Sequence, residues 1–461
     1  MAKPRVKART LPGFQDFVGG RAIGRQRMLD TIRSVYEAHG FAPLDTPAIE
    51  YEEVLTGQLD SDKEIFRFED EDGRRVALRF DLTVPLARLV AQHGQDVPRP
   101  FRRYHIASVW RADKPKPGRY REFMQCDVDI VGPGTVQADI EVLTVMHATL
   151  AALGLERFQI RINHRQLLTA MIAAAGADPA QTDDVLRSLD KVERLGWDTV
   201  AMLLSNPPEK MLEGIDAVPL GLPAEAVERI RGFVEIAGET PADVLAALRE
   251  YFGDEPLAKR GIDDLQAIHD SLVAAGVPAE QWCFDLSIAR GLAYYTGPIF
   301  ETALLDMPGF GSICSGGRYD GLIGRFTGQA VAATGTSIGI DRTYAALEKL
   351  GLTEQRANVA PVLMMALDKK MYDTYRALAA ELRAAGIATE VYVGKSGLKA
   401  QMRYADRMGF QVGLLLGGDE LAAGVVSLRR LDLPMDHPDK QETCPRDSLA
   451  ARIRELIEQE A

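Results

Sequence analysis

Residues Phe101 to Gly132 read FRRYHIASVWRADKPKPGRYREFMQCDVDIVG, and this stretch predicts a β-hairpin. Apolar residues alternate or run together on both sides of a loop that is rich in Pro, Lys and Gly. Because side chains two residues apart on a strand point to one face, we expect Gln125, Asp127 and Asp129 to share a face, with Arg111 on the neighbouring strand. Arginine binds phosphate and carboxylate through two hydrogen bonds, and an acid or a glutamine accepts from an ammonium group. This face therefore suits a phosphate together with a zwitterion.

The same stretch is strongly cationic in an acidic chain. The 461 residues carry a net charge of −12, which disfavours non-specific nucleic-acid binding. From Arg99 to Arg121, however, eight basic residues accompany a single acid, Asp113. A basic cluster alone is more often an exposed loop, but its place in the hairpin favours an anion site. The eight are Arg99, Arg102, Arg103, Arg111, Lys114, Lys116, Arg119 and Arg121.

The segments around the hairpin predict an antiparallel α+β domain. An amphipathic helix is expected near 24–40 with a glycine stop, an extended segment at 41–50, and a long helix near 136–153. Strands that come in runs with flanking helices argue against repeated βαβ units. The predicted strands are 76–80, 104–112, 123–131, 283–288, 299–305, 311–315 and 334–340.

The chain is long enough for several domains. Residues 167–281 are rich in Ala, Leu, Asp and Glu with helical periodicity, which predicts a helical insertion between two parts of the α+β domain, 1–166 and 282–350. After a linker at 351–360, residues 361–461 alternate strands and helices and predict a small α/β domain.

Composition also limits the partners of the chain. No apolar run approaches the roughly 20 residues that span a bilayer, and the N-terminus lacks a signal peptide, so we expect no membrane partner. The histidines show no metal-ligand spacing and the cysteines form no CxxC pair, which argues against a protein-ligated zinc and fits the reducing cytoplasm. The cysteines are Cys126, Cys283, Cys314 and Cys444.

A second candidate stretch is RGLAYYTGPIFE, residues 290–301, which CSGGRYDGL follows at 314–322. Arg290 precedes a glycine, so little shields it from a ligand. If this stretch is a strand, Tyr294 and Tyr295 point to opposite faces, and one can pack while the other hydrogen-bonds. A buried core strand would explain both tyrosines equally well, so this stretch alone does not decide the function.

A third candidate is GTSIGIDR, residues 335–342. Its small residues let a strand approach a ligand closely, and Arg342 opens a predicted helix beside that strand. The pattern of two glycines and an arginine is weak by itself.

Together, the order and spacing of these stretches resemble the class II aminoacyl-tRNA synthetases. The hairpin resembles motif 2, TPAIE around Pro47 resembles motif 1, and GTSIGIDR resembles motif 3. RGLAYYTG and SGGRYDGL resemble the signature of the histidyl-tRNA synthetase family, as does ALRFDLTVPLAR at 77–88. LKAQMRYADRMG at 398–409 resembles the anticodon-binding domain of that family. The resemblance covers essentially the whole chain and is weakest in the insertion.

The resemblance implies a class II catalytic domain with a helical insertion and a C-terminal α/β anticodon-binding domain. It implies that the carboxylate of L-histidine attacks the α-phosphate of ATP, and that tRNA(His) then takes the histidyl group from the adenylate at its 3′ end. ATP would arrive with Mg²⁺ on its outer phosphates. It also implies a cytoplasmic homodimer that forms through 24–50.

The resemblance also implies the site residues. Arg111 and Arg290 would be catalytic on either side of the α-phosphate, with Arg290 where related synthetases place a metal ion. ATP would be bound by Arg111, Arg121 and, at the β- and γ-phosphates, Arg342. The ammonium group of histidine would be bound by Asp81, Thr83 and Gln125. Its imidazole nitrogens would be bound by Asp129 and Tyr295. Arg111, Arg290 and Tyr294 would be further histidine-binding residues.

Two positions depart from the family pattern. Ala293 stands where an acid is common. Position 81 is Asp, as in eukaryotic-type members, whereas many bacterial members carry Glu there.

One alternative function is that of the catalytically inactive paralogue that serves as regulatory subunit of ATP phosphoribosyltransferase. A more remote one is a tRNA-binding module without activity. The paralogue typically lacks the C-terminal domain and the arginines that bind ATP. Arg111, Arg290, Arg342 and residues 361–461 therefore favour the synthetase.

Overall fold

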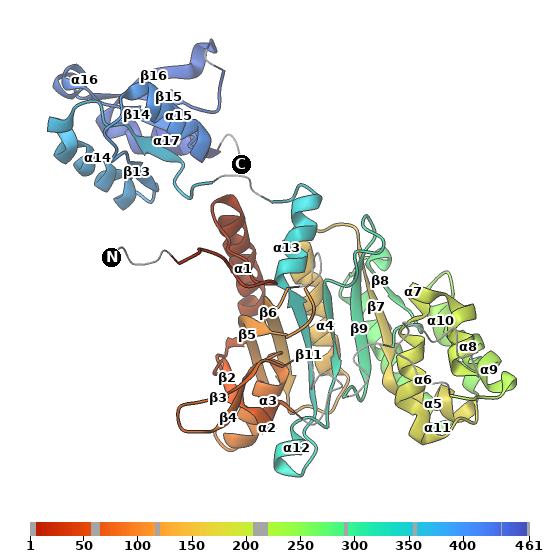
Figure 1. The fold of residues 1–461 in the computed structure, drawn as a ribbon. Coiled ribbons are helices and arrows are strands. Elements are labelled where there is room, and N and C mark those ends of the chain that lie inside the picture. The colour runs from red at the N-terminus through yellow and green to blue at the C-terminus, as the bar shows by residue number, and fades with distance from the viewer. Residues whose placement is uncertain are drawn as a thin grey trace. The chain divides into compact units, whose positions relative to one another are not determined.

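The structure is a computed structural model that describes residues 6–56, 65–115, 120–205, 220–289, 294–353, 357–434 and 436–458. The chain splits into two compact units (Figure 1). The first consists of Met1–Gln15 and Leu29–Leu352, and the second of Asp16–Met28 and Thr353–Ala461. In the described part of the chain, every helix is too short or too polar to cross a membrane.

An eight-stranded sheet forms the centre of the first unit (Figure 1). The predicted hairpin is confirmed, because β5 (Phe101–Trp110) and β6 (Glu122–Val131) pair antiparallel along their full length. The strand order is β1-β5-β6-β11-β10-β9-β7-β8. The inner pairs are antiparallel, as expected, whereas β1·β5 and β7·β8 at the two edges are parallel. The other strands are β1 (Ala42–Pro43), β7 (Phe158–His164), β8 (Trp282–Phe284), β9 (Pro298–Leu304), β10 (Cys314–Arg318) and β11 (Ala333–Gly339).

Helices pack against this sheet where the sequence predicts them. The long helix is α4 (Gln137–Ala152), which contacts β6, β10 and β11 and buries Val142 and Met146 completely. The N-terminal helix α1 (Gly20–Ala38) begins four residues earlier than expected and ends before Gly40, whose φ of 75° stops a helix at little cost. The helix that Arg342 was expected to open is α13 (Ile340–Lys349).

A three-stranded sheet of order β2-β4-β3 lies beside the central one. Its apolar cluster includes Phe80 and Leu86 and orders the segment between β4 and α3. That segment carries Asp81, and Thr83 is the first residue of α3, so this small sheet positions two of the expected site residues. The elements are β2 (Ile49–Tyr51), β3 (Arg67–Glu69), β4 (Arg75–Leu78), α2 (Glu52–Leu55), α3 (Thr83–Gln92) and α12 (Gly324–Thr327).

The stretch between β7 and β8 is helical where it is described, as its periodicity predicts. Its helix ends follow ordinary capping rules. For example, Thr240 and Asp243 form a reciprocal capping box at the start of α10, with Pro241 in the first helical position. The helices are α5 (Arg165–Ala174), α6 (Thr182–Leu189), α7 (Val192–Leu195), α8 (Trp197–Leu204), α9 (Ala224–Val234), α10 (Pro241–Phe252) and α11 (Pro256–Ala274).

The second unit contains a five-stranded sheet of order β13-β12-β14-β15-β16. Val362 and Met364 of β12 pack with α14 and α17, whereas Leu363 packs with α15, so helices cover both faces. The predicted alternation of strands and helices is confirmed. The unpredicted edge strand β16 reads QETCP, which lacks an apolar pattern. The elements are β12 (Val362–Met364), β13 (Thr389–Val391), β14 (Val412–Leu415), β15 (Val425–Arg430), β16 (Gln441–Pro445), α14 (Tyr372–Ala384), α15 (Leu398–Met408), α16 (Gly418–Ala423) and α17 (Leu449–Glu458).

Candidate active site

Two adjoining cavities lie in the first unit. The Arg342 cavity, of about 310 Å³, is lined by Arg342, Asp341, Phe123, Tyr120, Ser312 and Cys314, among others. The Asp129 cavity, of about 240 Å³, is lined by Asp129, Asp127, Asp81, Thr83, Tyr294 and Tyr295, among others. Both are also lined by Arg111, Gln125, Ser315 and Ser337, so the two cavities share a wall.

Strands β6 and β11 form the floor of these cavities. In the antiparallel register, Gln125 lies opposite Gly339, Asp127 opposite Ser337, and Asp129 opposite Gly335. The prediction that the three polar residues of β6 share one face is confirmed, since all three line the Asp129 cavity. A Cβ at Gly335 would overlap the Asp129 carboxylate, so the small residues of GTSIGIDR make room for protein side chains as well as for a ligand.

Arg111 lies where the two cavities meet. It follows the end of β5, and its backbone N–H donates to the Arg121 carbonyl at 2.8 Å. Its Nε donates to the Phe80 carbonyl at 3.1 Å, and its guanidinium lies 5.2 Å from the centre of the Phe123 ring. These contacts hold the planar guanidinium at the shared wall, where it can reach an anion in either cavity.

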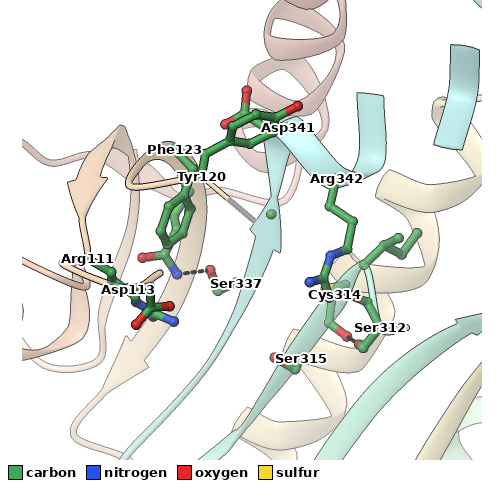
Figure 2. A pocket seen from close by; sticks show the side chains of 13 residues that line it. Arg111, Asp113, Tyr120, Phe123, Ser312, Cys314, Ser315, Ser337, Asp341 and Arg342 are labelled. Atoms are coloured by element: carbon green, nitrogen blue, oxygen red, sulfur yellow. Dashed lines mark hydrogen bonds between the residues drawn. The ribbon is translucent and has the colours of Figure 1, made fainter. Parts of the chain in front are cut away.

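Arg342 reaches into its cavity from the wall opposite Arg111 (Figure 2). It lies in the first turn of α13, and its Nη1 donates to the Ser312 carbonyl at 2.9 Å. Asp341 anchors this turn because its Oδ2 accepts the Met124 backbone N–H at 2.9 Å. A cationic side chain next to a helix N-terminus suits an anion such as a phosphate.

Phe123 was predicted only as an apolar strand residue, but it lines the Arg342 cavity together with Tyr120 (Figure 2). Aromatic faces of this kind stack with planar rings such as nucleobases. Strand alternation could not single it out, because a core phenylalanine produces the same pattern.

The Asp129 cavity contains a buried ion pair. Arg103 is fully buried, and its Nη2 lies 2.7 Å from Asp129 Oδ2. The Tyr319 hydroxyl donates to Asp129 Oδ1. Burial raises the pKa of Asp129, and Arg103 opposes that rise. Burial likewise raises the pKa of Asp81 to about 6, although the Val84 backbone N–H and Arg111 favour its ionised form.

Opposite faces were expected for Tyr294 and Tyr295 only if their stretch formed a strand, and the structure does not meet that condition. Strand β9 begins only at Pro298, and the two tyrosines precede it outside any strand. Their ring centres are 4.5 Å apart and their hydroxyl oxygens 3.4 Å apart. Both rings line the Asp129 cavity, and burial raises the pKa of Tyr294 to about 12.

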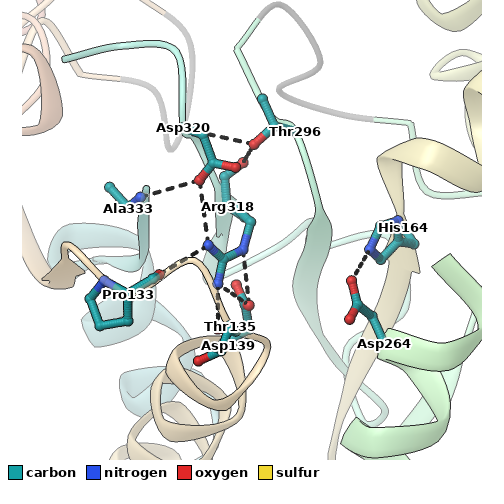
Figure 3. Close-up of polar contacts among 9 residues, drawn as sticks. All are labelled: Pro133, Thr135, Asp139, His164, Asp264, Thr296, Arg318, Asp320 and Ala333. Carbon is teal, nitrogen blue, oxygen red and sulfur yellow. Dashed lines mark hydrogen bonds and ion pairs between the residues drawn. The ribbon is translucent and has the colours of Figure 1, made fainter. Parts of the chain in front are cut away.

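An unpredicted network around Arg318 fixes the walls of this cavity (Figure 3). The Nε of Arg318 donates to Asp139 Oδ2 at 3.0 Å, and Nη2 donates to the Thr135 carbonyl at 2.8 Å. The Arg318 carbonyl accepts the Thr296 backbone N–H at 2.8 Å. Since Thr296 follows Tyr295 and Arg318 precedes Tyr319, this network holds two aromatic residues of the cavity.

We expect Asp139→Asn to lower the free energy of unfolding by about 1.5–3 kcal/mol, because it removes charged hydrogen bonds from a buried guanidinium. Asp139 is completely buried, so solvent cannot replace them. Urea denaturation measures the change. Asp373→Asn, which alters the exposed ion pair with Arg376, serves as control and should change the value by less than about 0.5 kcal/mol. Equal stability of the two variants would contradict the account.

Arg121 lines neither cavity, since its Nε donates to the Asp113 carbonyl at 3.0 Å and its guanidinium lies 5.5 Å from the Phe66 ring centre. Arg290 and Ala293, and Lys116 and Arg119 of the basic cluster, lie outside the described residues.

The described segment that leads to Arg290 is well anchored. Asn163 is buried, and its Nδ2 donates to the carbonyls of Leu286 at 3.1 Å and Ile288 at 2.9 Å. The Nε of Arg161 lies 2.7 Å from Asp285 Oδ2. These contacts join the segment to β7.

Known proteins resemble the chain along its length. A family model for histidyl-tRNA synthetase matches residues 13–343, and one for an anticodon binding domain matches 358–456. A histidine--tRNA ligase of Rhodopirellula baltica is 44% identical over 92% of this chain and 94% of its own length. One of Paracoccus denitrificans is 43% identical over 94% and 91%. The crystal structure of histidyl-tRNA synthetase from Nostoc sp. PCC 7120 has a TM-score of 0.85 at 32% identity and covers 98% of this chain and 100% of that one.

Proposed function

The chain belongs to the histidyl-tRNA synthetase family, and from this premise we propose which of its residues carry out the reaction. The reaction activates L-histidine with ATP to histidyl-adenylate and transfers the histidyl group to the 3′ end of tRNA(His). The names of the full-length relatives favour this activity over a regulatory subunit of ATP phosphoribosyltransferase.

The position of Arg111 in the lining of both cavities carries the assignment. Histidine occupies the Asp129 cavity and ATP the Arg342 cavity, so the histidine carboxylate and the α-phosphate meet at Arg111. A bidentate guanidinium there binds both anions and stabilises the charge that develops on the phosphate during attack. Positioning and charge stabilisation are the main requirements of such a transfer.

In the Arg342 cavity, Phe123 stacks on the adenine and Arg342 binds the β- and γ-phosphates, which carry Mg²⁺ when ATP enters. Arg290 is proposed on the far side of the α-phosphate, and Arg121 as a further ATP ligand, both from their motifs. We propose no protein-ligated zinc in this reaction.

In the Asp129 cavity, Asp81, Thr83 and Gln125 bind the ammonium group of histidine. Asp129 and Tyr295 bind the imidazole nitrogens, and Tyr294 supports Tyr295 through its neighbouring hydroxyl. Because each polar group of the cavity then has a partner on histidine, an amino acid without ring nitrogens leaves buried groups unpaired and binds more weakly.

We expect Tyr295→Phe to weaken histidine by about 1–3 kcal/mol, because the variant leaves a buried partner unpaired. The KM for histidine in ATP–pyrophosphate exchange measures the loss, and the KM for ATP should not change. Tyr372→Phe in the second unit is the matched control. A histidine KM equal to that of the unmodified protein would remove Tyr295 from the site.

The whole assignment is tested by ATP–pyrophosphate exchange with and without histidine. Exchange that depends on histidine supports the assignment, and folded protein that shows no exchange would contradict it.

We further propose that the chain forms a cytoplasmic homodimer through residues 24–50. Sedimentation in solution checks this oligomeric state.

A further inference from the structure

Asp127 is a buried carboxylate of the Asp129 cavity that the assignment above leaves without a role. It lies on β6 between Gln125 and Asp129 and is only 2% exposed. Ser337 hydrogen-bonds to this carboxylate, yet Oδ1 of Asp127 has no hydrogen-bond partner among the described residues. A buried acceptor in this state is costly, so its place in the wall of a cavity indicates a missing ligand donor.

Asp129 Oδ2 likewise has no hydrogen bond among the described residues, but it lies beside a cation, and Oδ1 of Asp129 has a hydrogen-bond partner. Arg103 Nη2 lies 2.7 Å from Oδ2, and the Tyr319 hydroxyl donates to Oδ1. Arg103 therefore compensates the negative charge of Asp129 more directly than that of Asp127. Asp127 is the more open acceptor of the two at this end of the cavity.

We propose that Asp127 Oδ1 accepts a hydrogen bond from the protonated imidazole ring of histidine, so that the cavity binds the substrate as an imidazolium ion. The proposal rests on the placement of histidine in the Asp129 cavity. Both nitrogens of an imidazolium are donors, whereas a neutral ring has one donor and one acceptor. Asp129 accepts from one ring N–H, and Asp127 together with the hydroxyl oxygen of Tyr295 accepts from the other.

The surroundings favour a proton held at this position. Burial raises the pKa of Asp127 to about 7, with Asp129 and Asp81 adding to the rise and Arg103 opposing it. Directly opposite on β5, His105 has a pKa lowered to about 4 by burial and by Arg103, so it is neutral near pH 7 and supplies no charge. The groups that face or electrostatically affect Asp127 include three on β5 or β6 and others on neighbouring elements: Arg103, His105, Asp129, Ser337, Cys314, Arg79, Asp81, Tyr36, Tyr294, Tyr295 and Tyr319.

The proposal predicts that histidine binding takes up a proton above neutral pH. At pH 8, free Asp127 and the free imidazole, with a pKa of about 6.5, are both mostly unprotonated. The complex keeps one proton between the carboxylate and the ring. Uptake therefore approaches one proton per histidine, and the Kd for histidine rises by about five- to tenfold from pH 7.5 to 8.5.

Calorimetric titration of the protein with histidine at pH 8, once in phosphate and once in Tris, measures this uptake from the difference in binding enthalpy between the two buffers. The α-amino group of free histidine also contributes to the proton uptake. The readout is therefore the difference in proton uptake between a variant and the unmodified protein. We expect Asp127→Asn to take up at least about half a proton less than the unmodified protein and to bind histidine about tenfold more weakly. Asp72→Asn, which alters a carboxylate whose side chain is 70% exposed, is the matched control and should match the unmodified protein.

Equal proton uptake by Asp127→Asn and the unmodified protein would overturn the role of Asp127. The pH dependence of the unmodified protein is a second test that needs no variant, and a constant Kd between pH 7.5 and 8.5 would overturn the proposal too. Histidine-dependent exchange is measured on the same preparation. Its absence would contradict the placement of histidine itself, whereas exchange with unchanged uptake contradicts the Asp127 proposal alone.

Discussion

Arg111→Ala is expected to lower the rate of histidine-dependent ATP–pyrophosphate exchange by about 10³-fold or more, even at saturating substrates. A single preorganised donor in a water-poor site contributes about 10²–10³ to a rate, and Arg111 lies in the walls of both cavities. Arg111→Lys should recover only a small part of the rate, because an ammonium group cannot form two parallel hydrogen bonds. Steady-state exchange measures both variants.

The matched control removes an arginine from the surface of the same unit. Arg157→Ala loses an exposed ion pair with Asp306 and should keep the full exchange rate. If Arg111→Ala exchanged as fast as Arg157→Ala, the meeting point of the two substrates would lie elsewhere.

Reversing three charges on α15 is expected to abolish most tRNA charging while it spares exchange. Lys399, Arg403 and Arg407 are exposed at four-residue spacing. The buried Gln401 holds the helix to the segment that follows β12, because its Nε2 donates to the Ala366 carbonyl at 2.7 Å. If each of the three makes one charged hydrogen bond to a tRNA phosphate, worth about 1.5–3 kcal/mol, losing all three lowers the affinity for tRNA by at least about 10³-fold. Aminoacylation at sub-saturating tRNA(His) measures this loss.

The control for that prediction reverses three other exposed charges of the second unit, Lys369, Lys370 and Arg376. It should leave charging within a few-fold of the unmodified protein. Equal loss in both triple variants would indicate a general charge effect. Loss of exchange in the α15 variant would show that the helix serves the catalytic unit instead.

The floor of the site could be predicted from the sequence because it depends on local periodicity. The two-residue repeat of a strand brings Gln125, Asp127 and Asp129 to one face without any knowledge of distant residues. The same holds for α4 and for the alternation in the second unit. By contrast, the parallel pairing of β1 with β5 and of β8 with β7 joins strands that lie far apart along the chain, so a local pattern does not reveal it.

The errors and omissions at the site also have non-local causes. Strand-like composition suggested opposite faces for Tyr294 and Tyr295, but the strand starts at Pro298 and both rings turn into one cavity. The roles of Arg103 and Arg318 depend on buried partners on other elements, Asp129 and Asp139. No spacing in the sequence distinguishes such arginines from surface ones.

A crystal structure with a non-hydrolysable histidyl-adenylate analogue shows directly which substrate each cavity binds. We expect the adenine against Phe123 and the imidazole between Asp127, Asp129 and Tyr295. The guanidinium of Arg111 should lie within hydrogen-bond distance of the group that replaces the α-phosphate. An analogue bound in the reverse orientation, or with Arg111 more than about 4 Å from that group, would contradict the assignment of the two cavities.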